Sequence, residues 1–183
     1  MSKDLGRFTK SGFFAQGNKG GVAIRLRLYD TYLVFVNTHL AAGKKEVERR
    51  NLDFSEVRPI RRRRRFIFRN DVKVARRITF TYPGDSPSDP PKSFGIHDSD
   101  YLFWIGDLNY RLPLPDQDVR NLMDEKKYKK LLKYDQLNVE RKAGRVFVGF
   151  EEGTVTFQPS YKYDPGTDNF DTRYGNAEHI IFF

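Results

Sequence analysis

Two short apolar runs of the sequence each end in residues that can do acid–base chemistry. Asn37 and His39 follow the run 33–36, and Asp107 and Asn109 follow the run 101–105. Side chains two positions apart in an extended segment lie on the same side, so Asp107 and Asn109 can act together. The carboxylate can take a proton from a water that the amide fixes, and His39 can hydrogen-bond a phosphoryl oxygen. These residues are suited to chemistry at a phosphoryl group.

Each of these signals also has an ordinary structural explanation. The letters GDLN are common turn chemistry, in which Asp and Asn side chains bond their own backbone. A single histidine after a strand is more often structural than catalytic. Gly106 allows the backbone to bend sharply as it leaves the strand. For each signal taken alone, the structural explanation is favoured. The combination of two such strand ends in one chain favours a functional role.

Two other segments could bind an anion. In GNKGG, residues 17–21, backbone amides and Lys19 could surround a phosphate, but no helix follows, so a hairpin turn is the simpler interpretation. In FQPSYKYD, residues 157–164, Lys162 stands between Tyr161 and Tyr163. One cation and two hydroxyl donors would suit a phosphate, whereas a solvated lysine flanked by packing aromatic rings is an equally good interpretation.

Strands and helices of mixed order must position these residues. Residues 20–43 predict two strands joined at 29–31. In the first, the alternation of Val22, Ile24, Leu26 and Leu28 with Arg25 and Arg27 indicates a half-buried strand with the apolar side inward. The run 33–36 predicts a strand covered on both faces, and residues 44–57 predict a helix.

The rest of the chain follows the same mixed pattern. Residues 81–95 are rich in Pro, Gly, Ser and Asp and predict an irregular loop, and 101–105 predict a short buried strand. Residues 116–137 predict helical structure with an acidic start, and 144–164 predict short β structure and turns. There are no internal repeats. We expect one layered α/β domain, because 183 residues would be cramped as two.

Composition excludes several classes of protein. The chain has no cysteine, which rules out disulfides and thiolate metal sites and suits a cytosolic or nuclear location. Its first residues lack the apolar core of a signal peptide, and no run of about 18 apolar residues predicts a membrane span. Residues 58–74 carry +7 of the net charge of +9. The basic character is therefore local and does not indicate a broad nucleic-acid surface.

Seven motifs, in order, resemble inositol polyphosphate 5-phosphatases, most of all the type II enzymes and the phosphatase defective in oculocerebrorenal syndrome. They are GNKGGVAIRL, FVNTHLAAG, ERRN, WIGDLNYRL, YDQL, FEEGTVTFQPSYKYD and DTR. The resemblance covers most of residues 10–173. It implies an endonuclease/exonuclease/phosphatase-type fold, a four-layer α/β sandwich, and Mg²⁺-dependent hydrolysis of the 5-phosphate of inositol polyphosphates and phosphoinositides.

The resemblance also implies a role for each candidate residue. Asp107 would orient and deprotonate the attacking water, Asn109 would hold the water or the phosphate, and His39 and Asn37 would contact the scissile group. The residues expected near the other inositol phosphates are Asn18, Lys19, Tyr161 and Lys162. Arg111 would support its neighbours. Mg²⁺ would stabilise the charge on the phosphoryl oxygens, and little covalent chemistry is needed.

The sequence departs from the family pattern in three places. The family's first strands, with the glutamate that holds Mg²⁺, have no counterpart, so no metal ligand is assigned. The match stops near Arg173, and 174–183 form a non-matching tail without the family's final Asp and Asp–His elements. Residues 58–74 interrupt a continuous family segment and predict an insertion. The alternative is a basic arm for anionic lipid or nucleic acid.

We therefore expect a single partial catalytic domain over 1–183, with N- and C-terminal strands missing. Low or no activity, and an aggregation-prone chain with exposed sheet edges and apolar faces, should follow. The expected partner is a phosphoinositide or soluble inositol polyphosphate, with peripheral contact to membranes from the cytoplasm. A non-catalytic phosphoinositide-binding fragment and a metal-dependent nuclease of the same superfold are the alternatives; nucleic acid is otherwise not expected.

Overall fold

The computed structural model describes residues 3–8, 19–54, 78–82, 88 and 90–171. The chain divides into two compact units. Unit 1 consists of Met1–Leu40 and Leu52–Leu108, and unit 2 of Ala41–Asn51 and Asn109–Phe183. Strands in unit 1 and helices in unit 2 confirm the mixed α/β content predicted from the sequence. The predicted insertion 58–74 and tail 174–183 lie outside the described residues.

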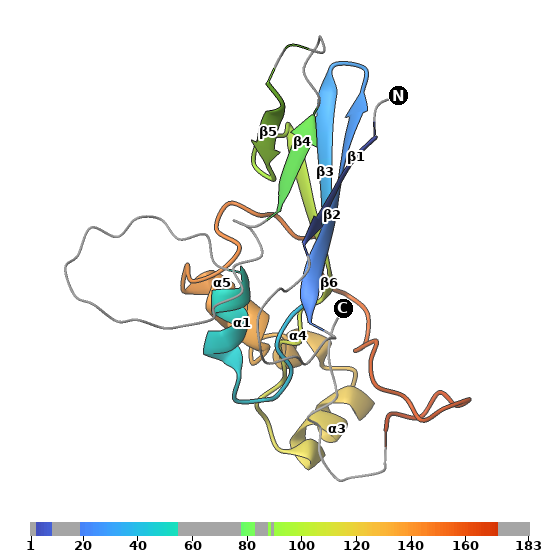
Figure 1. Cartoon of the computed structure of the whole chain (residues 1–183). Helices are drawn as coiled ribbons and strands as arrows, with labels where there is room; N and C mark the ends of the chain where they lie inside the picture. The colour runs from blue at the N-terminus through green and yellow to red at the C-terminus, as the bar shows by residue number, and fades with distance from the viewer. Residues whose placement is uncertain (1–2, 9–18, 55–77, 83–87, 89, 172–183) are drawn as a thin grey trace, which may run out of the picture. The chain divides into compact units, whose positions relative to one another are not determined.

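A four-stranded sheet forms most of unit 1 (Figure 1). Its strands, in the order β1-β2-β3-β6, are β1 (Lys3–Phe8), β2 (Gly20–Leu28), β3 (Thr31–His39) and β6 (Tyr101–Asp107). β1, β2 and β3 pair antiparallel, whereas β3 and β6 pair parallel. A turn with a positive φ of 54° at Tyr29 joins β2 to β3, as the sequence predicted.

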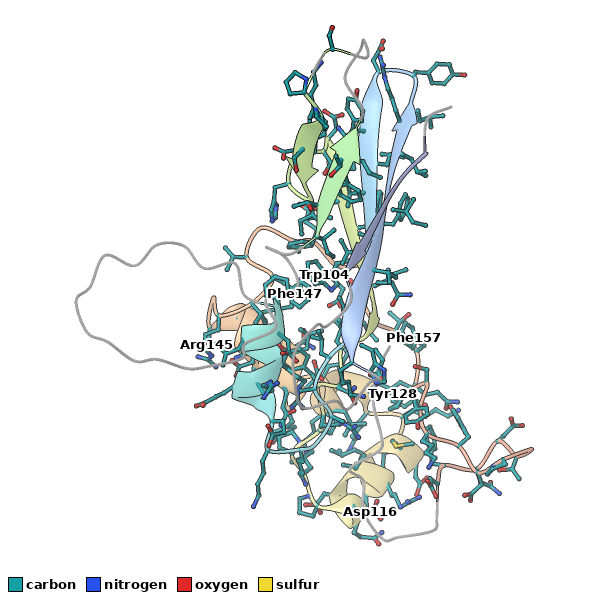
Figure 2. All side chains as sticks on the ribbon, in the orientation of Figure 1. Trp104, Asp116, Tyr128, Arg145, Phe147 and Phe157 are labelled. Atoms are coloured by element: carbon teal, nitrogen blue, oxygen red, sulfur yellow. The ribbon has the colours of Figure 1, made fainter. Side chains whose placement is uncertain are left out.

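One face of this sheet is covered by a second, two-stranded sheet. β4 (Thr79–Tyr82) pairs antiparallel with β5 (Lys92–Gly95). The apolar core between the sheets consists of Ala23, Val34, Val36, Ile78, Phe80 and Ile96. Trp104, labelled in Figure 2, packs against this core and donates a hydrogen bond to the Thr38 hydroxyl at 3.0 Å. The covered face therefore holds β3 and β6 in place.

The pairing of β4 with β5 corrects the prediction of an irregular loop over 81–95. Both ends of that segment belong to strands, in which Phe80 stands opposite Phe94. Aromatic and threonine residues favour a pleated, half-buried surface, and here that preference prevails over the Pro- and Gly-rich composition. Residues 83–87 and 89, between the strands, lie outside the described residues.

The other face of the four-stranded sheet is exposed, which corrects three predictions. Large apolar side chains on it are 40 to 60% exposed: Val22, Ile24, Leu28, Tyr101, Phe103 and Ile105. The predicted inward side of β2 is therefore wrong, and 101–105 is partly buried on one face and exposed on the other. In the run 33–36, Val34 and Val36 are fully buried and Leu33 and Phe35 are only partly buried.

Arg25 explains why β2 turns its basic side inward. Its side chain is 4% exposed, and its guanidinium lies 3.8 Å from the ring centre of Tyr32 and 4.5 Å from that of Phe94. It also donates to the carbonyl of Asp98 at 3.4 Å. Stacking on two rings stabilises a guanidinium that is withdrawn from water, because arginine is weakly hydrated.

Short helices form the core of unit 2. They are α1 (Val47–Phe54), which runs into unit 1 after Asn51, α3 (Asp116–Asp124), α4 (Tyr128–Leu131) and α5 (Gln136–Lys142). Val119 and Met123 of α3 and Leu131 of α4 pack with Leu112, which precedes α3, in one apolar core. The predicted helical region 116–137 is divided because Lys126 takes a left-handed φ of 53° and Asp135 caps a new helix.

A buried arginine ties the two segments of unit 2 together. Arg50 is 0% exposed and donates to the carbonyls of Ala41 and Gly43 at 3.1 and 2.6 Å. It also donates to the side-chain oxygen of Gln136 at 2.7 Å, and the Gln136 amide donates to the Lys44 carbonyl at 2.9 Å. These bonds fix α1 against the start of α5.

The region 144–164 contains less β structure than predicted. An isolated β-bridge joins Tyr163 to Phe170, and no strand lies after β6 among the described residues. In the described part of the chain, no helix is both long and apolar enough to cross a bilayer.

Candidate functional site

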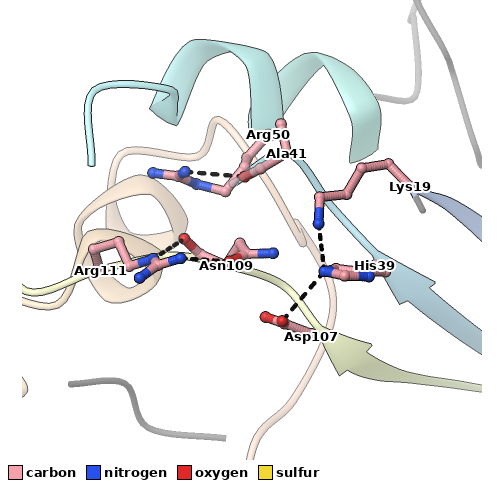
Figure 3. A network of polar contacts seen from close by, with 7 residues as sticks. All are labelled: Lys19, His39, Ala41, Arg50, Asp107, Asn109 and Arg111. Carbon is pink, nitrogen blue, oxygen red and sulfur yellow. Dashed lines mark hydrogen bonds and ion pairs between the residues drawn. The ribbon is translucent and has the colours of Figure 1, made fainter. Parts of the chain in front are cut away.

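The parallel pairing of β3 with β6 brings two predicted site residues face to face. In the register of these strands His39 stands opposite Asp107, and the imidazole Nε2 lies 3.4 Å from the carboxylate Oδ2 (Figure 3). Both side chains are only partly exposed, at 42% and 37%. Because strands deliver side chains rigidly, the carboxylate and the imidazole share one end of the sheet.

Lys19 completes this cluster in unit 1. Its Nζ lies 2.5 Å from His39 Nε2. Lys19 immediately precedes β2, whose first residue Gly20 stands opposite His39. An ammonium group, an imidazole and a carboxylate therefore meet at the ends of three adjacent strands. Such a cluster can bind an anionic oxygen and accept a proton from water.

Gly106 allows the strands to approach so closely. Its φ is +123°, and a Cβ added there would lie 2.1 Å from the carbonyl oxygen of Thr38. The same Cβ would lie 2.6 Å from the side-chain oxygen of Asn37. A side chain at position 106 would thus separate β3 from β6 next to Asp107.

Asn37 lies on the same sheet face as His39, because the two residues are two positions apart in β3. It stands opposite Ile105, two residues before Asp107, and it is exposed. The polar cluster is therefore one end of the exposed apolar face. Asn18, predicted beside Lys19, lies outside the described residues.

Asn109 and its predicted supporter Arg111 belong to unit 2 and are described within it. Asn109 is 3% exposed with a left-handed φ of 59°, which Asn tolerates better than most residues. Arg111 donates to its side-chain oxygen at 2.7 Å and to its carbonyl at 3.2 Å. This forked contact orients the amide, whose nitrogen is the donor suited to a phosphoryl oxygen.

The structure separates the roles of the three residues of the predicted phosphate-binding loop. The Tyr163 hydroxyl donates to the Pro159 carbonyl at 3.0 Å, and its ring stacks on that of Phe170. Tyr163 is therefore a packing residue. Tyr161 is 40% exposed, and Lys162 is partly exposed with its ammonium 3.1 Å from the Asp171 carboxylate.

Asp171 was missed by sequence reasoning. It is nine residues from Lys162, so no local spacing connects them. The signal that could have found it is the turn sequence PGTDN between the aromatic residues Tyr163 and Phe170, which predicts a hairpin and hence a cross-strand neighbour for Lys162.

The described residues do not by themselves fit a metal ion. They contain no group of three or more His, Cys, Asp or Glu side chains that could hold one. In unit 1, Asp107 faces the imidazole of His39, and Lys19 brings a positive charge to the same cluster. A divalent cation in proteins takes several oxygen ligands, so one carboxylate is too few.

Comparison with protein families and curated proteins gives a consistent result. The model of endonuclease/exonuclease/phosphatase family 2 matches residues 3–177. Mouse type II inositol 1,4,5-trisphosphate 5-phosphatase is 43% identical over 157 residues, which are 85% of this chain and 14% of that protein. Human synaptojanin-1 is 39% identical over 158 residues, 86% of this chain and 8% of that protein.

Comparison with solved structures agrees with the family model and the curated relatives. The inositol polyphosphate 5-phosphatase domain of SPsynaptojanin, in complex with inositol (1,4)-bisphosphate and calcium ion, superimposes with a TM-score of 0.67 at 33% identity. The match covers 93% of this chain and 42% of that chain. Cimex nitrophorin, at 22% identity and a TM-score of 0.58, matches 98% of this chain and shares the fold alone. The chain thus spans a small part of its curated relatives and less than half of the solved domain.

Proposed function

Because the chain belongs to endonuclease/exonuclease/phosphatase family 2, we propose that it carries part of the site with which an inositol polyphosphate 5-phosphatase hydrolyses the 5-phosphate of inositol phosphates and phosphoinositides. Two of the proteins it resembles are named as inositol 5-phosphatases, and the domain of SPsynaptojanin was solved with inositol (1,4)-bisphosphate. That compound is what remains when inositol 1,4,5-trisphosphate loses its 5-phosphate. The observation that carries the proposal is the cluster of Lys19, His39 and Asp107.

Each residue of the cluster has a part in the proposed reaction. Asp107 accepts a proton from the attacking water, which makes that water a better nucleophile. Lys19 and His39 stabilise the negative charge that develops on the phosphoryl oxygens. Within unit 2, Asn109 offers an amide donor suited to a phosphoryl oxygen, and Lys162 and Tyr161 offer an ammonium and a hydroxyl suited to a ring phosphate.

The proposal includes Mg²⁺ as cofactor, with its carboxylate ligands contributed by residues other than those the structure describes. The solved relative contains calcium, which supports a divalent ion in this family. Since the described cluster offers one carboxylate, we propose that this chain alone has low or no hydrolytic activity. We propose further that it acts at the cytoplasmic surface of membranes, where phosphoinositides are found.

Release of inorganic phosphate from inositol 1,4,5-trisphosphate with Mg²⁺, together with calorimetric binding of inositol (1,4)-bisphosphate, tests the proposal. We expect binding and at most slow release, with release abolished in Asp107→Asn. Asp30→Asn is the matched control, because its carboxylate is exposed in a turn of the same unit and pairs only locally with Arg27. Failure to bind would overturn the proposal.

Three other results are informative. Release at the rate of a complete 5-phosphatase domain would refute low activity while supporting the chemistry. Binding that persists without any release, and is unaffected by Asp107→Asn, would instead identify a non-catalytic phosphoinositide-binding fragment. Cleavage of plasmid DNA with Mg²⁺ would favour the nuclease alternative.

A further inference from the structure

Residues 161–171 form a closed hairpin around Lys162. The Asp171 amide donates to the Lys162 carbonyl at 2.9 Å, and the Asp164 amide donates to the Asn169 carbonyl at 2.9 Å. The turn between them is closed by the Thr167 amide, which donates to the Asp164 carbonyl at 3.1 Å. Lys162 and Asp171 are therefore cross-strand neighbours at the open end of the hairpin.

Packing anchors this hairpin to the helical core of unit 2. The Tyr163 and Phe170 rings stack with centres 4.4 Å apart, and Phe170 packs against the core that includes Val119 and Met123 of α3. From the same helix Arg120 donates to the Asp171 carbonyl at 2.7 Å. The backbone of Asp171 is thus held by a helix, and its side chain starts from a fixed position.

From that position the Asp171 carboxylate reaches the Lys162 ammonium at 3.1 Å. The carboxylate is only 9% exposed, whereas the Lys162 side chain is 32% exposed. A lysine side chain has four rotatable bonds and loses much freedom when it is ordered. The ammonium has three donors, so one bond to Asp171 leaves two that can face an anion.

We infer that Asp171 is a positioning residue, which holds the Lys162 ammonium in place to bind a ring phosphate of the substrate. The inference rests on the proposed function and adds to it the residue that orders the ring-phosphate contact. Without Asp171, binding would first have to order Lys162. A side chain ordered on binding weakens affinity by roughly three- to tenfold.

The negative charge of Asp171 would by itself weaken phosphate binding, whereas its positioning of Lys162 would strengthen it. The two effects predict opposite results when Asp171 is removed, which makes the inference testable. Asp171 is negative, and a nearby negative charge repels a phosphate. If repulsion prevailed, removing the carboxylate would tighten binding. If positioning prevails, as we infer, removing it weakens binding.

The experiment measures the dissociation constant of inositol (1,4)-bisphosphate by calorimetry for the wild-type chain, Lys162→Ala, Asp171→Ala and the double variant. We expect Asp171→Ala to weaken binding by about three- to tenfold. The double variant should bind no more weakly than Lys162→Ala, because Asp171 acts only through Lys162. Asp171→Glu should restore part of the loss. Asp168→Ala, an exposed acid in the same turn, is the matched control and should bind as wild type does.

Unchanged or tighter binding by Asp171→Ala would overturn the inference, as would additive losses in the double variant, which a merely structural role would produce. If thermal unfolding shows that Asp171→Ala is not folded, Asp171→Asn replaces it with the same expected direction. Absence of binding by the wild-type chain would instead be a failure of the proposed function, and the inference would fall with it.

Discussion

His39 and Asp107 face each other across parallel strands, and His39 Nε2 lies 3.4 Å from the Asp107 carboxylate and 2.5 Å from Lys19 Nζ. Both neighbours compete for the same ring nitrogen. A lysine ammonium can only donate, so Nε2 accepts from Lys19 and the ring proton belongs on Nδ1. Lys19 therefore selects the tautomer of His39.

This selection predicts the nitrogen NMR spectrum of the ring. Long-range ¹H–¹⁵N spectra should show His39 as the Nδ1–H tautomer. In Lys19→Met the donor is lost, and Nε2–H can instead donate to Asp107, so the other tautomer should gain by roughly tenfold, the size of one charge-assisted bond. Lys19→Arg keeps a donor and serves as control. The same tautomer ratio in wild type and Lys19→Met would contradict this assignment.

A side chain at position 106 should destabilise unit 1. In Gly106→Ala the new Cβ would lie 2.1 Å from the Thr38 carbonyl oxygen at a φ of +123°, so β3 and β6 must separate. We expect a loss of at least about 2 kcal/mol in the free energy of unfolding, measured in urea. Gly95→Ala, where the nearest atom would be 3.6 Å away, is the control and should change little. Equal stabilities of the two variants would refute the argument.

The cap of α5 should make stability depend on pH. Asp135 is 8% exposed and accepts from the Asn138 amide at 2.9 Å; burial, and then the nearby charge of Glu152, raises its pKa from 3.8 to about 6. The folded state therefore holds this proton more tightly than the unfolded state. Asp135 contributes stability at low pH that is lost as pH rises through about 6, on the order of 3 kcal/mol in total.

Asp135→Asn should remove this dependence, because asparagine caps a helix equally well without a charge. Relative to wild type, the variant should gain stability between about pH 4 and about pH 7 in urea unfolding. Asp118→Asn, an exposed acid in the first turn of α3, provides the control and should show little change. A difference between Asp135→Asn and wild type that is independent of pH would be incompatible with the raised pKa.

The exposed apolar face of the four-stranded sheet should cause self-association. Monomeric proteins rarely expose contiguous apolar patches larger than a few hundred Å². Replacing Phe103 and Ile105 together by threonine keeps β propensity and should lower association at least about tenfold in sedimentation velocity. Val36→Thr, on the buried face, should instead lower stability. A wild-type chain that sediments as a monomer at high concentration would refute the prediction.

Sequence patterns located the strand ends well but not the faces of the strands. The apolar runs before His39 and Asp107 predicted β3 and β6, because buried strands are short and apolar. The alternation in β2 predicted the wrong inward side, because periodicity reports two distinct faces and does not say which one is covered. Stacking of Arg25 on Tyr32 and Phe94 determines which face is covered, and these two rings belong to other strands.

The sequence predicted which residues belong to the candidate site better than it predicted which of them contact one another. The spacing of Asp107 and Asn109 suggested chemistry, but the pairing of His39 with Asp107 depends on strand register. Register is fixed by the pairing of whole strands and cannot be read from either strand alone. The engagement of Lys162 by Asp171 likewise depends on a hairpin that only packing onto α3 completes.

Arg50 also sets the order in which unit 2 can fold as the chain leaves the ribosome. Its guanidinium bonds Gln136, which is 86 positions further along. Closing so long a loop is slow, since its entropy must be lost before the contact is gained. Until translation has passed α5, the arginine on α1 lacks this bond and the nascent helix lacks its other contact with α5, the hydrogen bond from Asn51 to Glu140. A ribosome stalled before Gln136 would therefore display α1 as a protease-sensitive segment.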